Sequence, residues 1–369
     1  MDDRLAYIAL NMMEDVGPVG VRALAEHLGG ISAIFDASEG ELVGANGIGP
    51  KAAGRILAQR DRLDPEREIA NAERLGADII TPMDSEYPDA LRNIYDPPLA
   101  LMVRGSLQAR DQHSIAVVGT RNPSHYGREN ATALSQQISR VGFTVNSGLA
   151  RGVDTAAHQG ALQVGGRTLA VLGGALDCLY PRENAALADE IAGSGAVMTE
   201  LPLGRKPDKT TFPMRNRIVS GLSKGILVIE AGVKSGALIT ARQALEQGRS
   251  VFAVPGRIDN PSTRGCHQLI KEGARLVESI DDVLQEFEFL MPVNRMASEP
   301  TELELALEDD RFSDDERAVM AALTEGETDV DSIIRLSGIA TARVNSLLLG
   351  LEMKRALKLL PGRLVARAH

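Results

Sequence analysis

The stretch SIAVVGTRNPSHYGRENATALSQQISRVGFTVNSG, residues 114–148, decides the fold. It places a continuous apolar run, a helical segment and a second apolar run one after another. Continuous apolar runs are typical of strands buried on both faces of a sheet, and strands that alternate with helices indicate parallel βαβ units. The alternation continues through RTLAVLGG (167–174), AVMTEL (196–201), GILVIEAG (225–232) and SVFAVPG (250–256). The sequence therefore predicts an α/β fold with an extended Rossmann-like, doubly wound, mainly parallel sheet.

The segments directly after these strands are rich in Gly and Ser, and three of them carry a cation. In an open parallel sheet, ligands bind beyond the carboxyl ends of the strands, so we expect these segments to lie together. Glycine lets the backbone approach a ligand closely, and the N–H groups at a helix start favour anions. The predicted phosphate-binding segments contain Gly119, Thr120 and Arg121, then Ser147, Gly148, Arg151 and Gly152, and finally Lys234, Ser235 and Gly236.

The known nucleotide-binding motifs are not matched. GTRNPSHYG (119–127) is not G-x-G-x-x-G, and no G-x-x-x-x-G-K-[ST] occurs, so neither dinucleotide nor P-loop binding is supported. Asp154 and His158 lie four residues apart on a predicted helix, close enough to touch. Asp154, however, sits where an N-cap carboxylate is expected, so we do not predict an acid–base pair there.

A cationic tract, GRKPDKTTFPMRNR (204–217), follows the predicted strand at 196–201 and should lie at the same end of the sheet. It holds five cations, one acid and Phe212. In one interpretation Phe212 packs in the core, and Arg215 and Arg217 pair with acids in a solvated loop. In the other, Phe212 stacks on a base of single-stranded nucleic acid, because every base offers a flat face whatever the sequence.

Two regions flank the sheet domain, which is expected over residues 66–285. Residues 1–65 contain two glycine turns, each followed by an amphipathic helix, and predict a helix-hairpin-helix or SAM-like domain; GIGPK (47–51) is the better match. A helical protein-interaction module is the open alternative. Residues 286–312 hold eight acids and two arginines and predict a solvated linker. Residues 313–369, with three predicted helices and a hairpin, predict a winged-helix domain.

Composition limits the partners and the compartment. A formal charge of −10 argues against a uniformly basic nucleic-acid coat, but it allows a local basic groove because screening confines charges to about 8–10 Å. Two cysteines without local spacing fit a reducing compartment, and six scattered histidines predict no metal site. No signal peptide or membrane-spanning run is predicted, so we expect a cytoplasmic protein without membrane contact.

Six segments, in order and with similar spacing, resemble the bacterial DNA-processing protein A (DprA/Smf) family, the recombination mediators of natural transformation. The resemblance covers about residues 66–275. The segments are VVGTR, NSGLARGVDTAAH, AVLGGALDCLYP, FPMRNRIVSGLS, VIEAGVKSGALITARQALEQGR and VFAVPG.

The resemblance implies sequence-independent binding of single-stranded DNA, a homodimer, and loading of a RecA-type recombinase on the strand. It implies no catalysis, so no catalytic residue, cofactor or metal is expected. Many members have Ser where this chain has Thr120, which keeps the hydroxyl. The resemblance places a phosphate contact on Arg121, a second cation on Lys209 and a stacking ring on Phe212, and it completes the pocket with Arg215, Asn216, Arg217 and the KSGA loop (234–237).

Two other classes of function fit the sequence less well. The sheet also resembles nucleoside-monophosphate phosphoribohydrolases of the lysine-decarboxylase-like family, whose P-G-G-x-G-T-x-x-E motif supplies a glutamate. The corresponding segment here has no carboxylate from 231 through 245. A transcription factor led by the winged helix is disfavoured because residues 313–369 hold eight acids and eight bases.

Overall fold

The computed structural model describes residues 1–287 and most of 313–367, with gaps at 324–327, 342, 345–346, 349–350, 352–355 and 361–363. It divides into two compact units, Met1–Leu290 and Met291–His369. Within the described part of the chain, no helix is both long and apolar enough to cross a membrane.

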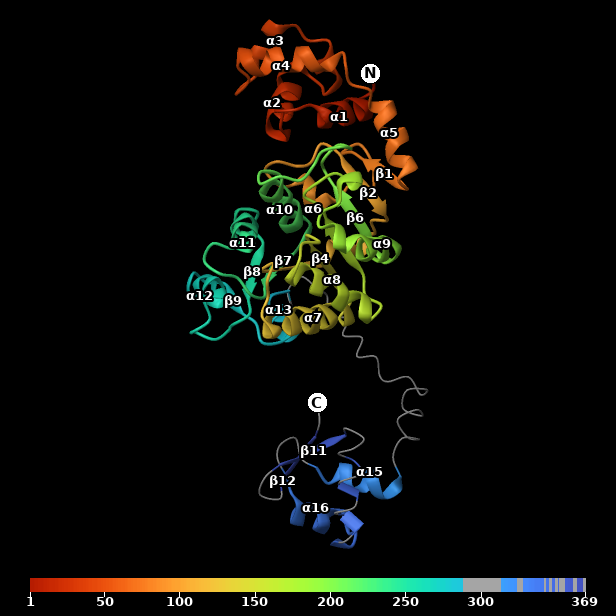
Figure 1. The fold of residues 1–369 in the computed structure, drawn as a ribbon, viewed down its shortest axis with the longest axis vertical. Coiled ribbons are helices and arrows are strands. Elements are labelled where there is room, and N and C mark those ends of the chain that lie inside the picture. The colour runs from red at the N-terminus through yellow and green to blue at the C-terminus, as the bar shows by residue number, and fades with distance from the viewer. Residues whose placement is uncertain are drawn as a thin grey trace. The chain divides into compact units, whose positions relative to one another are not determined.

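The first unit is built on a nine-stranded sheet in the order β1-β2-β6-β5-β4-β3-β7-β8-β9. Figure 1 shows β1 and β2 toward one edge of this sheet and β8 and β9 toward the other. In this order, each strand from β6 to the β9 edge pairs in parallel with its neighbour, which includes β5, β4, β3, β7 and β8. Strand β2 is antiparallel to both β1 and β6. The predicted mainly parallel sheet is confirmed. The strands are β1 Ala77–Ile80, β2 Leu101–Gly105, β3 Ser114–Val118, β4 Thr144–Ser147, β5 Thr168–Val171, β6 Ala196–Thr199, β7 Gly225–Val228, β8 Ser250–Ala253 and β9 Arg275–Leu276.

Helices cover both faces of this sheet, which explains the continuous apolar runs. Successive side chains of a strand point to opposite faces. Leu169 and Val171 of β5 belong to the cluster that contains α10 and α11 residues, whereas Ala170 packs in a second cluster with Ile191 of α9. The helices are α6 Asp89–Arg92, α7 His125–Arg140, α8 Val153–Gln163, α9 Ala185–Ser194, α10 Thr211–Leu222, α11 Gly236–Glu246, α12 Arg264–Lys271 and α13 Ile280–Phe287.

The winding of the chain reverses at β3. From β3 the chain proceeds through β4 and β5 to β6 on one side, and then returns to β7 on the other side of β3. At such a reversal the connections that follow the two adjacent strands, here β3 and β7, run in opposite directions and leave a crevice at the carboxyl ends of these strands. The two helices that start there are capped by serines: Ser124 accepts from the backbone N–H of Gly127 and Ser235 from that of Ala237.

The N-terminal region is helical, as predicted. Its helices α2 and α4 each follow a glycine N-cap and begin with a proline, whose missing N–H costs nothing in the first turn. Ile8 and Ala72 of this region pack against Ile79 and Met102 of the sheet. The helix-hairpin-helix assignment and its alternative, a protein-interaction module, stay predictions. The helices are α1 Asp3–Met12, α2 Pro18–Leu28, α3 Glu39–Gly44, α4 Pro50–Arg60 and α5 Pro65–Arg74.

The second unit has the predicted winged-helix composition of helices and a small sheet. Its strands pair antiparallel in the order β10-β12-β11. The predicted third helix falls partly outside the described residues, as does the predicted linker 286–312 from residue 288 on. The boundaries at 65/66, 285/286 and 312/313 stay predictions. The described elements are α15 Asp314–Ala321, β10 Thr328–Asp329, α16 Val330–Ser337, β11 Leu357–Leu360 and β12 Leu364–Arg367.

Candidate nucleic-acid interface

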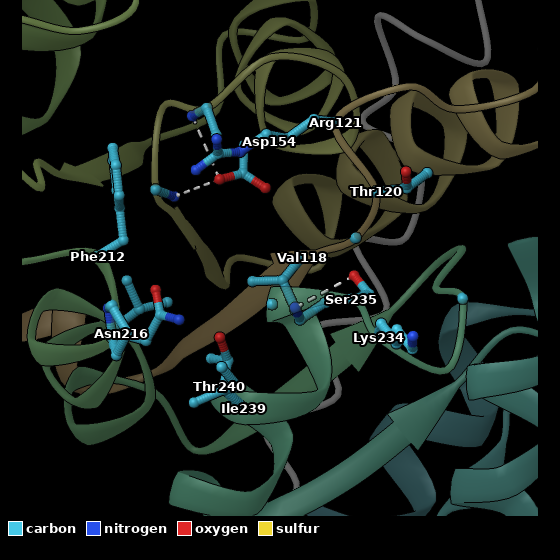
Figure 2. A pocket seen from close by; sticks show the side chains of 18 of the residues that line it. Val118, Thr120, Arg121, Asp154, Phe212, Asn216, Lys234, Ser235, Ile239 and Thr240 are labelled. Atoms are coloured by element: carbon cyan, nitrogen blue, oxygen red, sulfur yellow. Dashed lines mark hydrogen bonds between the residues drawn. The ribbon is translucent and has the colours of Figure 1, made fainter. Parts of the chain in front are cut away.

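A cavity of about 820 Å³ opens at the carboxyl ends of β3, β4 and β7, where the winding reverses. Five segments far apart in the sequence line it: the connections after β3, β4, β7 and β8, and the stretch from Lys209 into the first turns of α10. Figure 2 shows Phe212 and Asn216 on one side of the hollow and Lys234 with Ser235 on the other. The sheet thus brings together the loops that the sequence predicted to meet.

The charged side chains that line this cavity are mainly cations. Arg121, Lys209 and Lys234 are exposed, and Arg215 is buried. Among the described residues that line it, Asp154 is the one acid, and its carboxylate is buried. The exposed side chains therefore present positive charge to a ligand, on a chain whose formal charge is −10.

Arg215 and Asp154 form the base of the cavity. Arg215 donates to the backbone carbonyls of Gly148 and Val171. Asp154 accepts from the backbone N–H groups of Gly148, at 3.2 Å, and Ala150, at 3.3 Å. Burial lowers the pKa of Arg215 to about 10, a shift that the Asp154 charge opposes. Burial likewise raises the pKa of Asp154, and Arg215 opposes that rise.

These contacts correct the role expected for Asp154. Gly152 is the N-cap of α8, and Asp154 is the second residue of the helix. Its carboxylate fixes the connection after β4 instead of capping its own helix. His158 takes a different partner: its Nδ1 lies 2.7 Å from Thr168 Oγ1, and burial lowers its pKa to about 3.

Phe212 is half-buried at the start of α10, so its ring is neither a core anchor nor fully solvated. The ring rests against Gly173, where a Cβ atom would lie 2.7 Å from Phe212 Cδ1. The Arg121 guanidinium carbon lies 4.9 Å from the ring centroid, within cation–π range. The cation therefore lies over the aromatic ring, and the two groups together can contact the phosphate and the base of a nucleotide.

The start of α11 adds an anion-binding element. Ser235 caps the helix through the N–H of Ala237, and Lys234 precedes it. A Cβ atom built on Gly236 would meet nothing within 4 Å, so the backbone there is open to the cavity that Gly236 lines. A phosphate can approach these N–H groups closely.

Most of the predicted site residues meet in this cavity. Those that line it are Gly119, Thr120, Arg121, Gly148, Lys209, Phe212, Arg215, Asn216, Lys234, Ser235 and Gly236.

Four predicted residues do not line it. The buried Ser147 hydroxyl donates to the carbonyl of Val117 at 2.6 Å. A Cβ atom on Gly152 would collide with the backbone of Thr120 and Arg121, so this glycine serves loop packing.

The other two are arginines that pair with acids. Arg151 makes a bidentate pair with Glu183, with both contacts at 2.7 Å. Arg217 is buried and pairs with Glu200 and, at 2.9 Å, with Asp96. The solvated-loop interpretation was thus right that Arg217 pairs with acids.

Sequence reasoning missed the contribution of the connection after β8. Pro261 and Ser262 from that connection line the cavity. The signal was present, because SVFAVPG predicts a strand and the segment that follows it must lie at the same end of the sheet.

Two family models match the chain. The family model described as DNA recombination-mediator protein A matches residues 78–288, and that of the DprA winged helix domain matches 294–363. The chain is 33% identical over 393 residues to the protein Smf of Synechocystis sp., covering 96% of each chain.

Two solved structures are also similar. The DNA processing protein A of Streptococcus pneumoniae superposes with a TM-score of 0.67 at 33% identity, covering 78% of this chain and 98% of that one. The Helicobacter pylori protein, whose structure concerns its single-stranded DNA binding mode, gives a TM-score of 0.50 at 28% identity, covering 57% of this chain and 95% of that one.

The position of Arg217 generates a prediction. Replacing Arg217 with Met leaves the buried Glu200 carboxylate without this partner and should lower the free energy of unfolding by about 3–5 kcal/mol. Oligonucleotide affinity per folded molecule should stay unchanged. Urea unfolding and fluorescence anisotropy measure the two quantities.

The double variant Arg217→Met/Glu200→Leu is the control, and it should regain part of the lost stability because an apolar pair replaces the ion pair. A loss of affinity in Arg217→Met that matches the loss in Arg121→Ala would instead place Arg217 in the interface.

Proposed function

Because the chain belongs to the DNA recombination-mediator protein A family, we propose that it binds single-stranded DNA without sequence preference in the 820 Å³ cavity and loads a RecA-type recombinase on the bound strand during natural transformation. It acts as a cytoplasmic mediator and not as an enzyme. Family membership supports the recombinase partner and the homodimer, while the cavity supports the DNA ligand.

One observation carries the DNA ligand: the half-buried ring of Phe212 lies among exposed cations at the rim of a cavity that includes a helix start. Base–aromatic stacking contributes roughly 1–3 kcal/mol per base and is tolerant of sequence. In a duplex the base faces are covered by their neighbours, so a ring reaches them only at the cost of unstacking the duplex, a cost that is smaller in a single strand. The eleven predicted site residues that line the cavity, the first being Gly119 and the last Gly236, form the proposed interface.

The hydrolase alternative finds no support in the carboxylates around the cavity. Asp154 is held by backbone N–H groups and by Arg215. Glu230, which ends the apolar run after β7, is buried and accepts from the N–H and hydroxyl of Ser124. Both carboxylates hold loops in place, which is a structural task.

The salt dependence of binding tests the proposal. With Arg121, Lys209 and Lys234 exposed, we expect a slope of roughly −2 in log K against log[salt] for single strands, at about −0.7 per neutralised phosphate. Duplexes of the same sequence should bind more weakly. Fluorescence anisotropy across a salt series measures both.

Variants sharpen that measurement. Arg121→Ala and Lys209→Ala should each flatten the slope by about 0.7, uniformly across sequences. Arg110→Ala is the matched control, since this exposed arginine precedes β3 and lies toward the amino ends of the strands. Equal affinity for duplex and single strands would contradict the proposal.

Phe212 substitutions test stacking directly. Phe212→Ala should weaken single-strand binding by about 1–3 kcal/mol, or roughly five- to 150-fold, while Phe212→Tyr keeps the flat face and should bind like the parent. The free energy of unfolding should fall by less than the roughly 3–5 kcal/mol of a core phenylalanine truncation, because the ring is only half-buried. Phe212→Leu decides the matter: if it binds as tightly as the parent, the ring is not a platform.

Gly236→Ala tests close approach of a phosphate to the start of α11. The new methyl group meets no protein atom within 4 Å, and alanine favours a helix more than glycine, so the melting temperature should not fall. Single-strand affinity should drop because the methyl occupies space that the phosphate needs. Gly54→Ala in α4 is the control, because a Cβ atom there also meets nothing within 4 Å. It should lower neither the melting temperature nor the single-strand affinity. Unchanged affinity in Gly236→Ala would remove the helix start from the interface.

A further inference from the structure

A second, smaller cavity of about 130 Å³ adjoins the first one. The two share Arg121, Gly148, Ala150 and Phe212 in their linings, so Phe212 and Arg121 stand between them. The far side of the smaller cavity is formed by Arg151 and Tyr180. A strand that passes Phe212 on this side therefore reaches Tyr180 next.

Tyr180 is an exposed ring in a chain with few aromatics. Tyr180 is 43% exposed, and the chain contains five tyrosines, seven phenylalanines and no tryptophan. Its ring centroid lies 6.2 Å from that of Phe212, with the ring planes tilted by 58°. Bases stacked on two rings at this angle cannot also stack on each other, so the strand would bend between them.

The neighbours of Tyr180 hold it in place and neutralise the local charge. Asn184 donates to the carbonyl of Leu149 and to the hydroxyl of Thr155, both at 2.9 Å, which ties the segment after Tyr180 to the connection after β4. The Arg151 guanidinium carbon lies 6.0 Å from the Tyr180 ring centroid. Because Glu183 pairs with Arg151 through two contacts, this cation is already compensated.

We propose that Tyr180 is a second stacking platform, which takes the base of the nucleotide next to the one on Phe212 in the same single strand. The inference rests on the proposed function, since it needs a strand in the main cavity. Arg121, which lines both cavities, meets the phosphate between the two bases. Tyr180 contributes a flat face with little net charge, because the Arg151 beside it is paired.

The salt dependence of binding distinguishes the contribution of an uncharged ring from that of a cation. Tyr180→Leu should weaken binding of oligothymidylate by about fivefold or more, the lower end of base–aromatic stacking. The slope of log K against log[salt] should stay that of the parent, whereas Arg121→Ala flattens it. Tyr180→Phe should bind like the parent because the ring is kept.

Tyr95→Leu is the matched control. Tyr95 is 73% exposed and has the Arg22 guanidinium 5.6 Å from its ring centroid, yet it lines neither cavity. Its substitution should leave affinity unchanged. A second measurement uses the unaltered chain: an oligonucleotide with 5-iododeoxyuridine at successive positions should photocross-link to Phe212 and, from the adjacent position, to Tyr180.

The outcomes distinguish this inference from the function on which it rests. If Phe212→Leu loses affinity while Tyr180→Leu binds like the parent and no cross-link forms at Tyr180, the second platform is overturned and the proposed function stands. If Tyr180→Phe loses as much as Tyr180→Leu, the hydroxyl group and not the ring makes the contact, which also overturns it. If the parent binds no single strands, the proposed function falls first.

Discussion

The buried guanidinium of Arg215 is the contact on which the geometry of the site depends. It joins the end of β5, through the Val171 carbonyl, to the connection after β4, through the Gly148 carbonyl, and it is itself part of α10. A Cβ atom on Gly148 would collide with this guanidinium, so the glycine is required there. Because Phe212 lies three residues before Arg215 on the same helix, the contact that fixes Arg215 also fixes the direction of the ring.

The reversal of the winding at β3 explains how an acidic chain can present a basic cavity. The connections after β3 and β7 run in opposite directions, so that Arg121 and Lys234 line the same cavity from different connections. The nearby acids serve as internal acceptors: Asp154 binds backbone N–H groups, and Glu230 binds Ser124. The positive charge thus stays exposed, and the negative charge is used inside the fold.

Much of the sheet could be predicted from the sequence, because continuous apolar runs reflect strands that are buried on both faces. The position of Phe212 at the carboxyl end of the sheet could also be predicted, because its tract directly follows a predicted strand. Of the two arginines on α10 that were expected in the pocket, Arg215 lines it and Arg217 does not. Helix geometry limits their placement: the two are two residues and about 200° apart, so one cavity cannot receive both. Arg217 accordingly pairs with Glu200 on the other side. The burial of Ser147 and the position of Tyr180 depend on contacts between distant segments, which no local pattern encodes.

The bare backbone behind Phe212 has a consequence for the speed of binding. Since Gly173 carries no side chain, the ring lies against the end of β5 and is held there before any ligand arrives. A ring that is already in place loses little rotational freedom when a base stacks on it. Under the proposed function, the rate of association is then set by the diffusional encounter, which the exposed cations accelerate at low ionic strength, and differences in affinity among strands arise mainly from how slowly each one leaves.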